Sequence, residues 1–123
     1  MKEGVRRLPD AELAVMQAVW ACPVPVARAQ IEKKVEHPMA LTTLLTLLSR
    51  LVEKGFLTVQ KDGRNNLYTP TITQQEYLAG QSRRFLDQLC GGNVSVFATA
   101  LCDGGMTRQE LEELRRLLEE GGL

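Results

Sequence analysis

The sequence of 123 residues contains a single histidine, His37, the side chain most often used in acid–base catalysis. No Ser, Cys or Lys stands in a pattern that would activate it as a nucleophile. It also lacks a run of about 18 apolar residues that would cross a bilayer, and its N-terminal residues form no signal-peptide pattern. We therefore predict a cytoplasmic protein that is not an enzyme.

Cysteine is scarce as well. The three cysteines, Cys22, Cys90 and Cys102, are odd in number and too widely spaced for a disulfide framework or a paired zinc site. A lone histidine adds no cluster of metal ligands. We expect reduced, mostly buried thiols, no metal and no cofactor.

The formal net charge of zero conceals an uneven distribution along the chain. Residues 1–72 hold ten Lys or Arg against seven Asp or Glu, a net charge of +3, and residues 73–123 hold five against eight, a net charge of −3. The positive N-terminal part suits a polyanionic partner better than the C-terminal part does. A difference of this size is also common in domains that bind no nucleic acid.

Proline divides the N-terminal part of the chain into two predicted helices. Pro9 and the acidic residues that follow it are typical of the first turn of a helix. Apolar residues then recur at helical spacing, namely Leu13, Met16, Val19 and Trp20. This helix is expected to end at Ala21, because two further prolines break the chain and leave Val24 and Val26 in a short extended link. Residues 27–35 predict a second, short helix.

Residues 41–54 predict an amphipathic helix whose apolar and polar sides separate cleanly. The apolar side consists of Leu44, Leu47, Leu48 and Leu51. The polar side consists of Thr42, Thr46, Ser49 and Glu53, with Thr43 and Arg50 beside it. Gly55 follows in the position that glycine favours after the end of a helix.

Two short β-prone runs come next, at residues 56–60 and 66–69. The segment that joins them contains Asp62-Gly63, a strong hairpin signal. Three helices followed by a hairpin, with the third helix presenting small polar side chains, is the element order of a winged helix-turn-helix. We therefore predict a mainly α fold with a small β-hairpin, called the wing below, and a winged-helix domain over residues 1–72.

The remaining residues, 73–123, predict a helical dimerisation domain. Thr73 and Thr107 each begin a Thr-x-x-Glu capping box, and a further short helix is expected between residues 94 and 101. These short helices cannot bury their apolar residues well in isolation, so we expect pairing with a second copy of the chain. The residues assigned to the dimer contact are Tyr77, Phe85, Leu86, Leu89, Val96, Phe97, Leu101, Leu111, Leu114 and Leu118.

The polar side of the third helix and the wing are the candidate DNA-binding surfaces. Thr side chains donate or accept hydrogen bonds at base edges and present a methyl group to the methyl of thymine. We assign base contacts to Thr42, Thr43 and Thr46, and a contact with guanine or phosphate to Arg50. Cations and hydroxyls at a hairpin suit the DNA backbone, and we assign that role to Lys61, Arg64 and Tyr68.

A second interpretation, from another functional class, stays open. The modest charge of the first domain and the Thr-rich, Arg-poor helix face also fit a winged-helix interaction module that docks a protein and binds no DNA. DNA binding weakens steeply with salt, whereas a protein interface does so much less. Salt dependence therefore separates the two interpretations.

Several stretches of the chain resemble, in their joint order, the penicillinase and methicillin-resistance repressor family of bacterial transcription regulators. They are LPDAELAVMQAVW at residues 8–20, LTLLSRLVEKGFL at 45–57, YTP at 68–70, the glycine pair at 91–92 and ELEELR at 110–115. The resemblance implies a homodimer that binds double-stranded DNA at a palindromic operator and represses an operon of the antibiotic-resistance or stress-response type until a signal arrives.

The chain departs from this family at positions that concern induction and operator choice. In the best-known members a membrane receptor senses a β-lactam and the repressor is cut at an Asn-Phe bond. The corresponding bond is near Thr99 and Ala100, where neither residue is present, so the sequence does not support an inducing protease. Family members often carry Lys or Arg where Thr42 and Leu45 stand, which predicts a different operator. A copper-responsive branch has C-terminal Cys-x-Cys motifs that residues 119–123 lack, so we expect no copper control.

Overall fold

The structure, a computed structural model, describes residues 6–121 and divides the chain into two compact units. The first unit, called the head below, extends to Gln81, and the second begins at Ser82; each is described by itself. Lys2 and Glu3, which entered the charge balance, and Leu123, in the C-terminal segment, lie outside the described residues.

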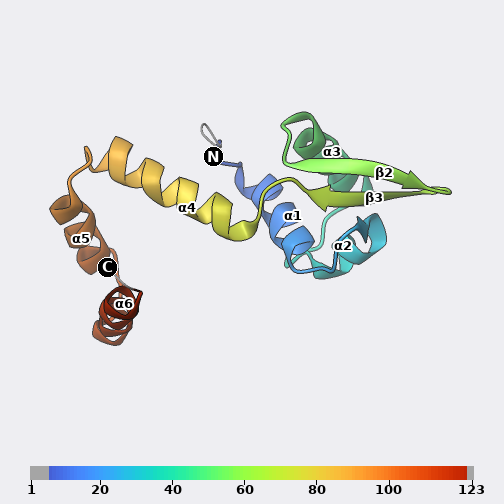
Figure 1. Cartoon of the computed structure of the whole chain (residues 1–123). Helices are drawn as coiled ribbons and strands as arrows, with labels where there is room; N and C mark the ends of the chain where they lie inside the picture. The colour runs from blue at the N-terminus through green and yellow to red at the C-terminus, as the bar shows by residue number, and fades with distance from the viewer. Residues whose placement is uncertain (1–5, 122–123) are drawn as a thin grey trace. The chain divides into compact units, whose positions relative to one another are not determined.

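Three short helices form the helical side of the head: α1 (Asp10–Trp20), α2 (Arg28–Lys34) and α3 (Leu41–Glu53) (Figure 1). They confirm the three helices that the sequence predicts. The four leucines on one side of α3 are each at most 5 % exposed and belong to one core with the apolar side of α1. Because burial of a leucine side chain contributes about 1.5–3 kcal/mol, this contact holds α3 in place.

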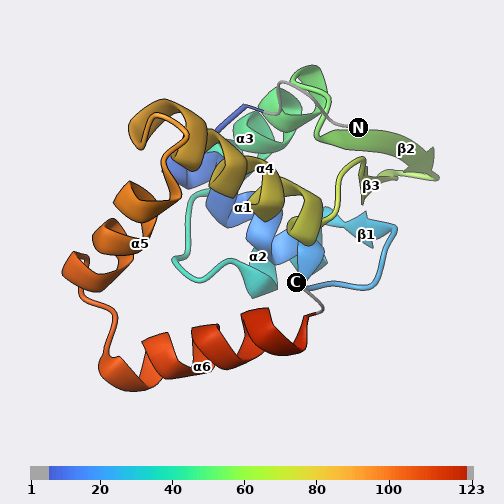
Figure 2. The same cartoon turned by 60° about the vertical axis from the view of Figure 1, so that its left-hand side comes forward.

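A three-stranded antiparallel sheet completes the head, where the sequence predicts only a two-stranded hairpin. The wing is formed by β2 (Leu57–Asp62) and β3 (Asn65–Pro70), and Figure 2 shows β1 (Val26–Ala27) beside β3. Pairing of Val26 with Tyr68 makes the expected extended link a strand at the edge of the sheet. Because this pairing joins segments far apart in the chain, no local pattern indicates it.

Two glycines supply the backbone conformations that the wing requires. Gly55 (φ +83°) ends α3 in a Schellman motif, in which the Phe56 amide donates to the Leu51 carbonyl over 2.9 Å. Gly63 (φ +64°) is the first central residue of the turn between β2 and β3, where a type II′ hairpin requires a positive φ. The wing thus follows directly from the end of α3 and projects beyond the helices of the head (Figure 1).

The helix after the wing, α4 (Gln74–Arg84), begins in the head, and its Tyr77 belongs to the core there. The Tyr77 hydroxyl accepts a buried hydrogen bond of 2.8 Å from the Leu8 amide. Its ring lies against those of Trp20 and Phe56, with centroids 5.7 and 6.0 Å away. Tyr77 therefore ties the start of the chain, the end of α1 and the start of β2 together.

This packing changes the predicted division of the chain. The boundary after residue 72 moves to Gln81, because the first turns of α4 pack into the head. Tyr77 leaves the set of residues assigned to the dimer contact, since its side chain is already covered within the head. Glu76 joins the head on the new division, and the net charge of residues 1–81 becomes +2.

The second unit consists of helices and short loops in its described part. A π-helical turn, η1 (Phe85–Leu89), continues from α4 and is followed by α5 (Val94–Asp103) and α6 (Arg108–Glu120). Both predicted capping boxes are present. The Glu110 amide donates to the Thr107 side chain over 3.1 Å and the Thr107 amide donates to the Glu110 carboxylate over 2.8 Å; the same pair of bonds starts α4.

An ion pair inside the head joins the first turn of α1 to the end of α3. The Glu12 side chain is 4 % exposed, and its carboxylate accepts a hydrogen bond of 2.5 Å from the Lys54 ammonium. A buried carboxylate is costly unless it is paired, so the bond favours one position of α3 against α1. The two residues are distant in the sequence, which is why the sequence did not predict their pairing.

Within residues 6–121, no helix is long and apolar enough to cross a membrane. The three cysteines are free, and the expectation of mostly buried thiols is wrong: Cys90 is buried, Cys22 is half-buried and Cys102 is exposed. In the same range, no three His, Cys, Asp or Glu side chains lie together as metal ligands.

Tyr77→Phe should lower the free energy of unfolding by about 1–3 kcal/mol, because it leaves the buried Leu8 amide without its acceptor. Chemical denaturation of the intact chain measures the loss. Tyr68→Phe, at an equally buried tyrosine that takes no part in this bond, is the matched control. Equal losses in the two variants would contradict the role given to the Tyr77 hydroxyl.

Lys54→Met should lower the free energy of unfolding by about 3 kcal/mol, because it leaves the Glu12 carboxylate buried and unpaired. This is the low end of the range for a buried pair, since the Lys54 side chain is 24 % exposed. The double variant Glu12→Gln/Lys54→Met should regain most of the loss in the same denaturation experiment. A double variant no more stable than Lys54→Met would show that the unpaired carboxylate is not the cause.

Candidate nucleic-acid interface

The outer face of α3 lies opposite its buried leucines and is open to solvent. Thr42, Thr43, Thr46 and Arg50 are all exposed on it. An α-helix fits the major groove of B-DNA, so these side chains lie where base edges would be within reach once the helix entered the groove. The sequence correctly predicts which side of α3 faces outward, because the leucine periodicity alone determines it.

One threonine on this face has its hydroxyl engaged. Thr46 Oγ1 donates to the Thr42 carbonyl, one turn earlier, over 2.9 Å. The bond occupies the hydroxyl proton, so Thr46 offers a ligand only an oxygen lone pair and a methyl group. Its chemistry toward a base is therefore narrower than the sequence suggests.

The tip of the wing is a small positive surface. Lys61 and Arg64 are exposed there, with Asp62 as the carboxylate between them in the sequence. Lys61 is paired across the hairpin with Asn66, and Asp62 with Asn65. Two cations and two amides against one carboxylate suit phosphate oxygens.

Tyr68, which the sequence assigns to the DNA backbone, does not belong to this surface. It is 5 % exposed and is part of the core of the head. It lies on β3, the central strand of the sheet, where Val26 of β1 and Val59 of β2 flank it. In a two-stranded hairpin, one edge of β3 at Tyr68 would have been unpaired. Here Val26 of β1 pairs with Tyr68 along that edge. We therefore remove Tyr68 from the predicted DNA contacts.

Two exposed lysines that the sequence analysis did not select end α2. Lys33 and Lys34 lie in its last turn, just before the link to α3. In a helix-turn-helix the helix before the recognition helix crosses the DNA backbone. Adjacent lysines at the end of that helix are the signal that would have identified them. The head thus presents cations from α2, α3 and the wing.

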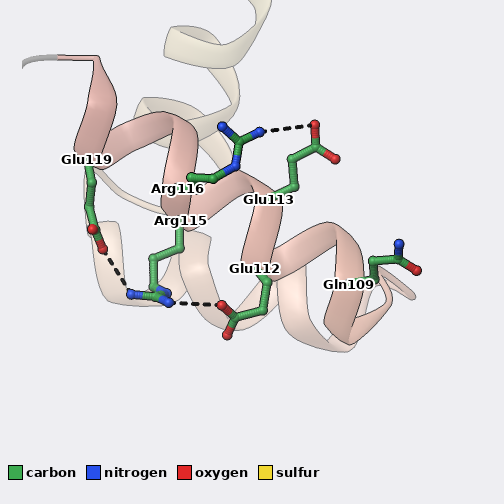
Figure 3. Close-up of a pocket in the computed structure, with 6 residues that line it drawn as sticks. All are labelled: Gln109, Glu112, Glu113, Arg115, Arg116 and Glu119. Carbon is green, nitrogen blue, oxygen red and sulfur yellow. Dashed lines mark hydrogen bonds and ion pairs between the residues drawn. The ribbon is translucent and has the colours of Figure 1, made fainter.

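Three arginines of the second unit, Arg83, Arg115 and Arg116, pair with carboxylates about one helical turn away. Arg115 donates to Glu112 over 2.9 Å and to Glu119 over 3.0 Å on the charged side of α6 (Figure 3). The hydrogen bond to Glu112 is the main reason that the pKa of Arg115 lies above its ordinary value. Hydrogen bonds from Arg83 likewise hold the pKa of the Asp87 carboxyl below its ordinary value. We assign these arginines no DNA contact.

The residues assigned to the dimer contact in the second unit are incompletely covered. Phe85, Leu89, Val96 and Leu118 are exposed, and Leu86, Phe97, Leu101, Leu111 and Leu114 are half-buried. The rings of Phe85 and Phe97, 5.5 Å apart, join η1 to α5. Among residues 82–121, only Cys90 is buried. The second unit therefore has an apolar surface without a hydrophobic core of its own beneath it.

Known proteins similar to this chain bear on both units. The family model named Penicillinase repressor matches residues 8–120. The chain is 30 % identical over 119 residues to the penicillinase repressor of Bacillus licheniformis, which covers 94 % of this chain and 92 % of that protein. It is 26 % identical over 122 residues to the methicillin resistance regulatory protein MecI of Staphylococcus aureus (strain N315), which covers 98 % of this chain and 99 % of that protein.

A solved structure shares the fold of the head. It is the solution structure of the Bacillus licheniformis BlaI monomeric form in complex with the blaP half-operator, with a TM-score of 0.50 and 32 % identity over 59 % of this chain and 90 % of that chain. The winged-helix element order is thus shared with a protein solved on DNA, and the relatives are named as repressors and regulators rather than as enzymes. The chain belongs to the penicillinase-repressor family.

Proposed function

We propose that the chain is a homodimeric transcriptional repressor that binds a palindromic DNA operator through α3 and the wing. The observation that carries the proposal is the exposed polar face of α3, which four buried leucines hold outward. Its relative BlaI, solved in complex with a half-operator, supports the same use of the head. The sequence predicts an operon of the antibiotic-resistance or stress-response type, and the names of the relatives favour the first of these.

In this proposal α3 lies in the major groove and the wing lies along the flanking backbone. Thr42, Thr43 and Thr46 contact base edges, and Arg50 contacts a guanine or a phosphate. Lys61 and Arg64, in the wing that follows α3, contact phosphates. The two lysines that end α2, which precedes α3, add further phosphate contacts. Each cation that neutralises a phosphate releases a counterion, so the affinity depends on salt.

A second copy of the chain covers the apolar surface of the second unit in this proposal. The exposed fractions there are large: 74 % for Leu89, 46 % for Val96, 52 % for Leu117 and 49 % for Leu118. Exposed apolar residues gathered in so small a helical unit are typical of an interaction site. The charged side of α6 satisfies its own ion pairs, which leaves the leucine side as the one that needs a partner. Two joined heads would then bind two half-sites with a gain in affinity from effective concentration.

An interaction module that docks a protein through the same surface is the second candidate. The small net charge of the head and the presence of only one arginine on the outer face of α3 favour it. A protein interface would depend much less on salt than a DNA interface, since it releases no condensed counterions.

The proposal is tested by selecting duplexes from a random DNA pool with the intact chain and measuring the affinity of the selected duplex across a salt series. We expect an inverted repeat with half-sites about one helical turn or more apart. The logarithm of the affinity should fall by about one unit per logarithmic unit of salt for each phosphate contacted. Failure to enrich any sequence at low salt would contradict the proposal and favour the interaction module.

The same binding experiment with Arg50→Ala should give an affinity about tenfold weaker, because the change removes a charged contact from the groove. Arg116→Ala is the matched control, since Arg116 is exposed on α6 and pairs with carboxylates of its own helix. Sedimentation should show both variants as dimers. Wild-type affinity in Arg50→Ala would remove Arg50 from the interface.

Leu118→Glu should raise the dimer dissociation constant by more than about tenfold, because it places an unpaired carboxylate in an apolar contact. Sedimentation equilibrium of the intact chain measures the constant. Gln109→Glu, which adds the same charge on the charged side of α6, should leave it nearly unchanged (Figure 3). An unchanged constant in Leu118→Glu would place the dimer contact elsewhere.

A further inference from the structure

Two leucines are exposed on the outer surface of α3. Leu41 is 44 % exposed and Leu45 is 42 % exposed, although the helix has a buried leucine side that accommodates four others. They lie one turn apart and therefore on the same side of the helix, next to the line of Thr42 and Thr46. At 3.6 residues per turn, Arg50 and Thr43 lie on the other side of the line formed by Thr42 and Thr46. The outer face of α3 thus has an apolar flank and a cationic flank.

The major groove offers an apolar side chain one favourable partner. Base edges there carry hydrogen-bond donors and acceptors, and the only apolar group among them is the C5-methyl group of thymine. A leucine placed against the polar edges would desolvate them without replacing their hydrogen bonds, which is costly. A leucine placed against a methyl group removes apolar surface from water on both sides.

Thr46 offers a further aliphatic group, on the line between the two flanks. Its hydroxyl proton is used within α3, in the bond to the Thr42 carbonyl, so it does not donate to a base in this conformation. The side chain of Thr46 is exposed, and it lies about 100° around the helix from Leu45. Three side chains near the N-terminal half of α3, the half that contacts base edges in helix-turn-helix proteins, therefore offer aliphatic groups.

We infer that Leu41 and Leu45 form an apolar strip that contacts thymine methyl groups in the operator and so determines part of its sequence. The inference rests on the proposed function and makes it more specific: each half-site contains thymines whose methyl groups contribute to affinity. Arg50, on the other flank, supplies a polar contact that is independent of these methyls.

The test uses the duplex selected by the intact chain, with each thymine of one half-site replaced in turn by deoxyuridine, which lacks only the C5-methyl group. At fixed salt, loss of a contacted methyl should weaken binding of the unsubstituted protein about fourfold. At least one of the deoxyuridine replacements that weaken binding of the unsubstituted protein should have no effect on binding of Leu45→Ala or of Leu41→Ala. Both changes are at exposed positions and introduce the best helix former, so the melting temperature should stay within a few degrees.

Val24→Ala is the matched control. Val24 is an aliphatic side chain exposed to a similar extent, 49 %, but it lies between α1 and α2 rather than on α3. This variant should keep both the affinity and the full response to deoxyuridine. Equal binding of the thymine and deoxyuridine duplexes, or an unchanged response in both leucine variants, would overturn the inference and leave the repressor function standing. Failure to select any duplex would overturn the inference together with the proposed function.

Discussion

Burial of the leucine side of α3 against α1 is the contact on which the arrangement of the head depends. Four leucines, each contributing about 1.5–3 kcal/mol, determine how α3 is rotated about its own axis, and the threonines and Arg50 face outward as a consequence. The Glu12–Lys54 ion pair also restricts how far α3 can shift along its axis, because a buried carboxylate tolerates little displacement of its partner. The packing of the core therefore determines where the outer face of α3 lies.

The wing depends on the same helix through its C-terminal end. Gly55 turns the chain out of α3 into β2, so a displacement of α3 would carry the wing with it. The short strand β1 then joins the other side of β3 and converts a hairpin into a sheet. Helix and wing are thus held as one body in the head, which is the condition for both to contact one duplex at the same time.

The two units differ in how completely they bury their apolar residues. The head has a core that runs from Leu8 to Tyr77 and needs no partner to cover it. The described part of the second unit buries only Cys90 and leaves leucines, valines and an aromatic side chain exposed. Capping boxes and ion pairs one turn apart stabilise its helices locally, but they contribute little beyond each helix. We therefore expect the second unit to be stable only when it dimerises.

The helices of the head, the glycine turns of the wing, the capping boxes and the outward side of α3 could all be predicted from the amino-acid sequence, because each follows from periodicity or local backbone chemistry within one segment. Three contacts could be found only in the folded structure: Val26 pairs with Tyr68, Glu12 pairs with Lys54, and Tyr77 packs between Trp20 and Phe56. These contacts join residues distant in the chain, and their formation depends on the three-dimensional path that brings them together. For that reason the tyrosine assigned to DNA is a core residue, and the tyrosine assigned to the dimer holds the head together.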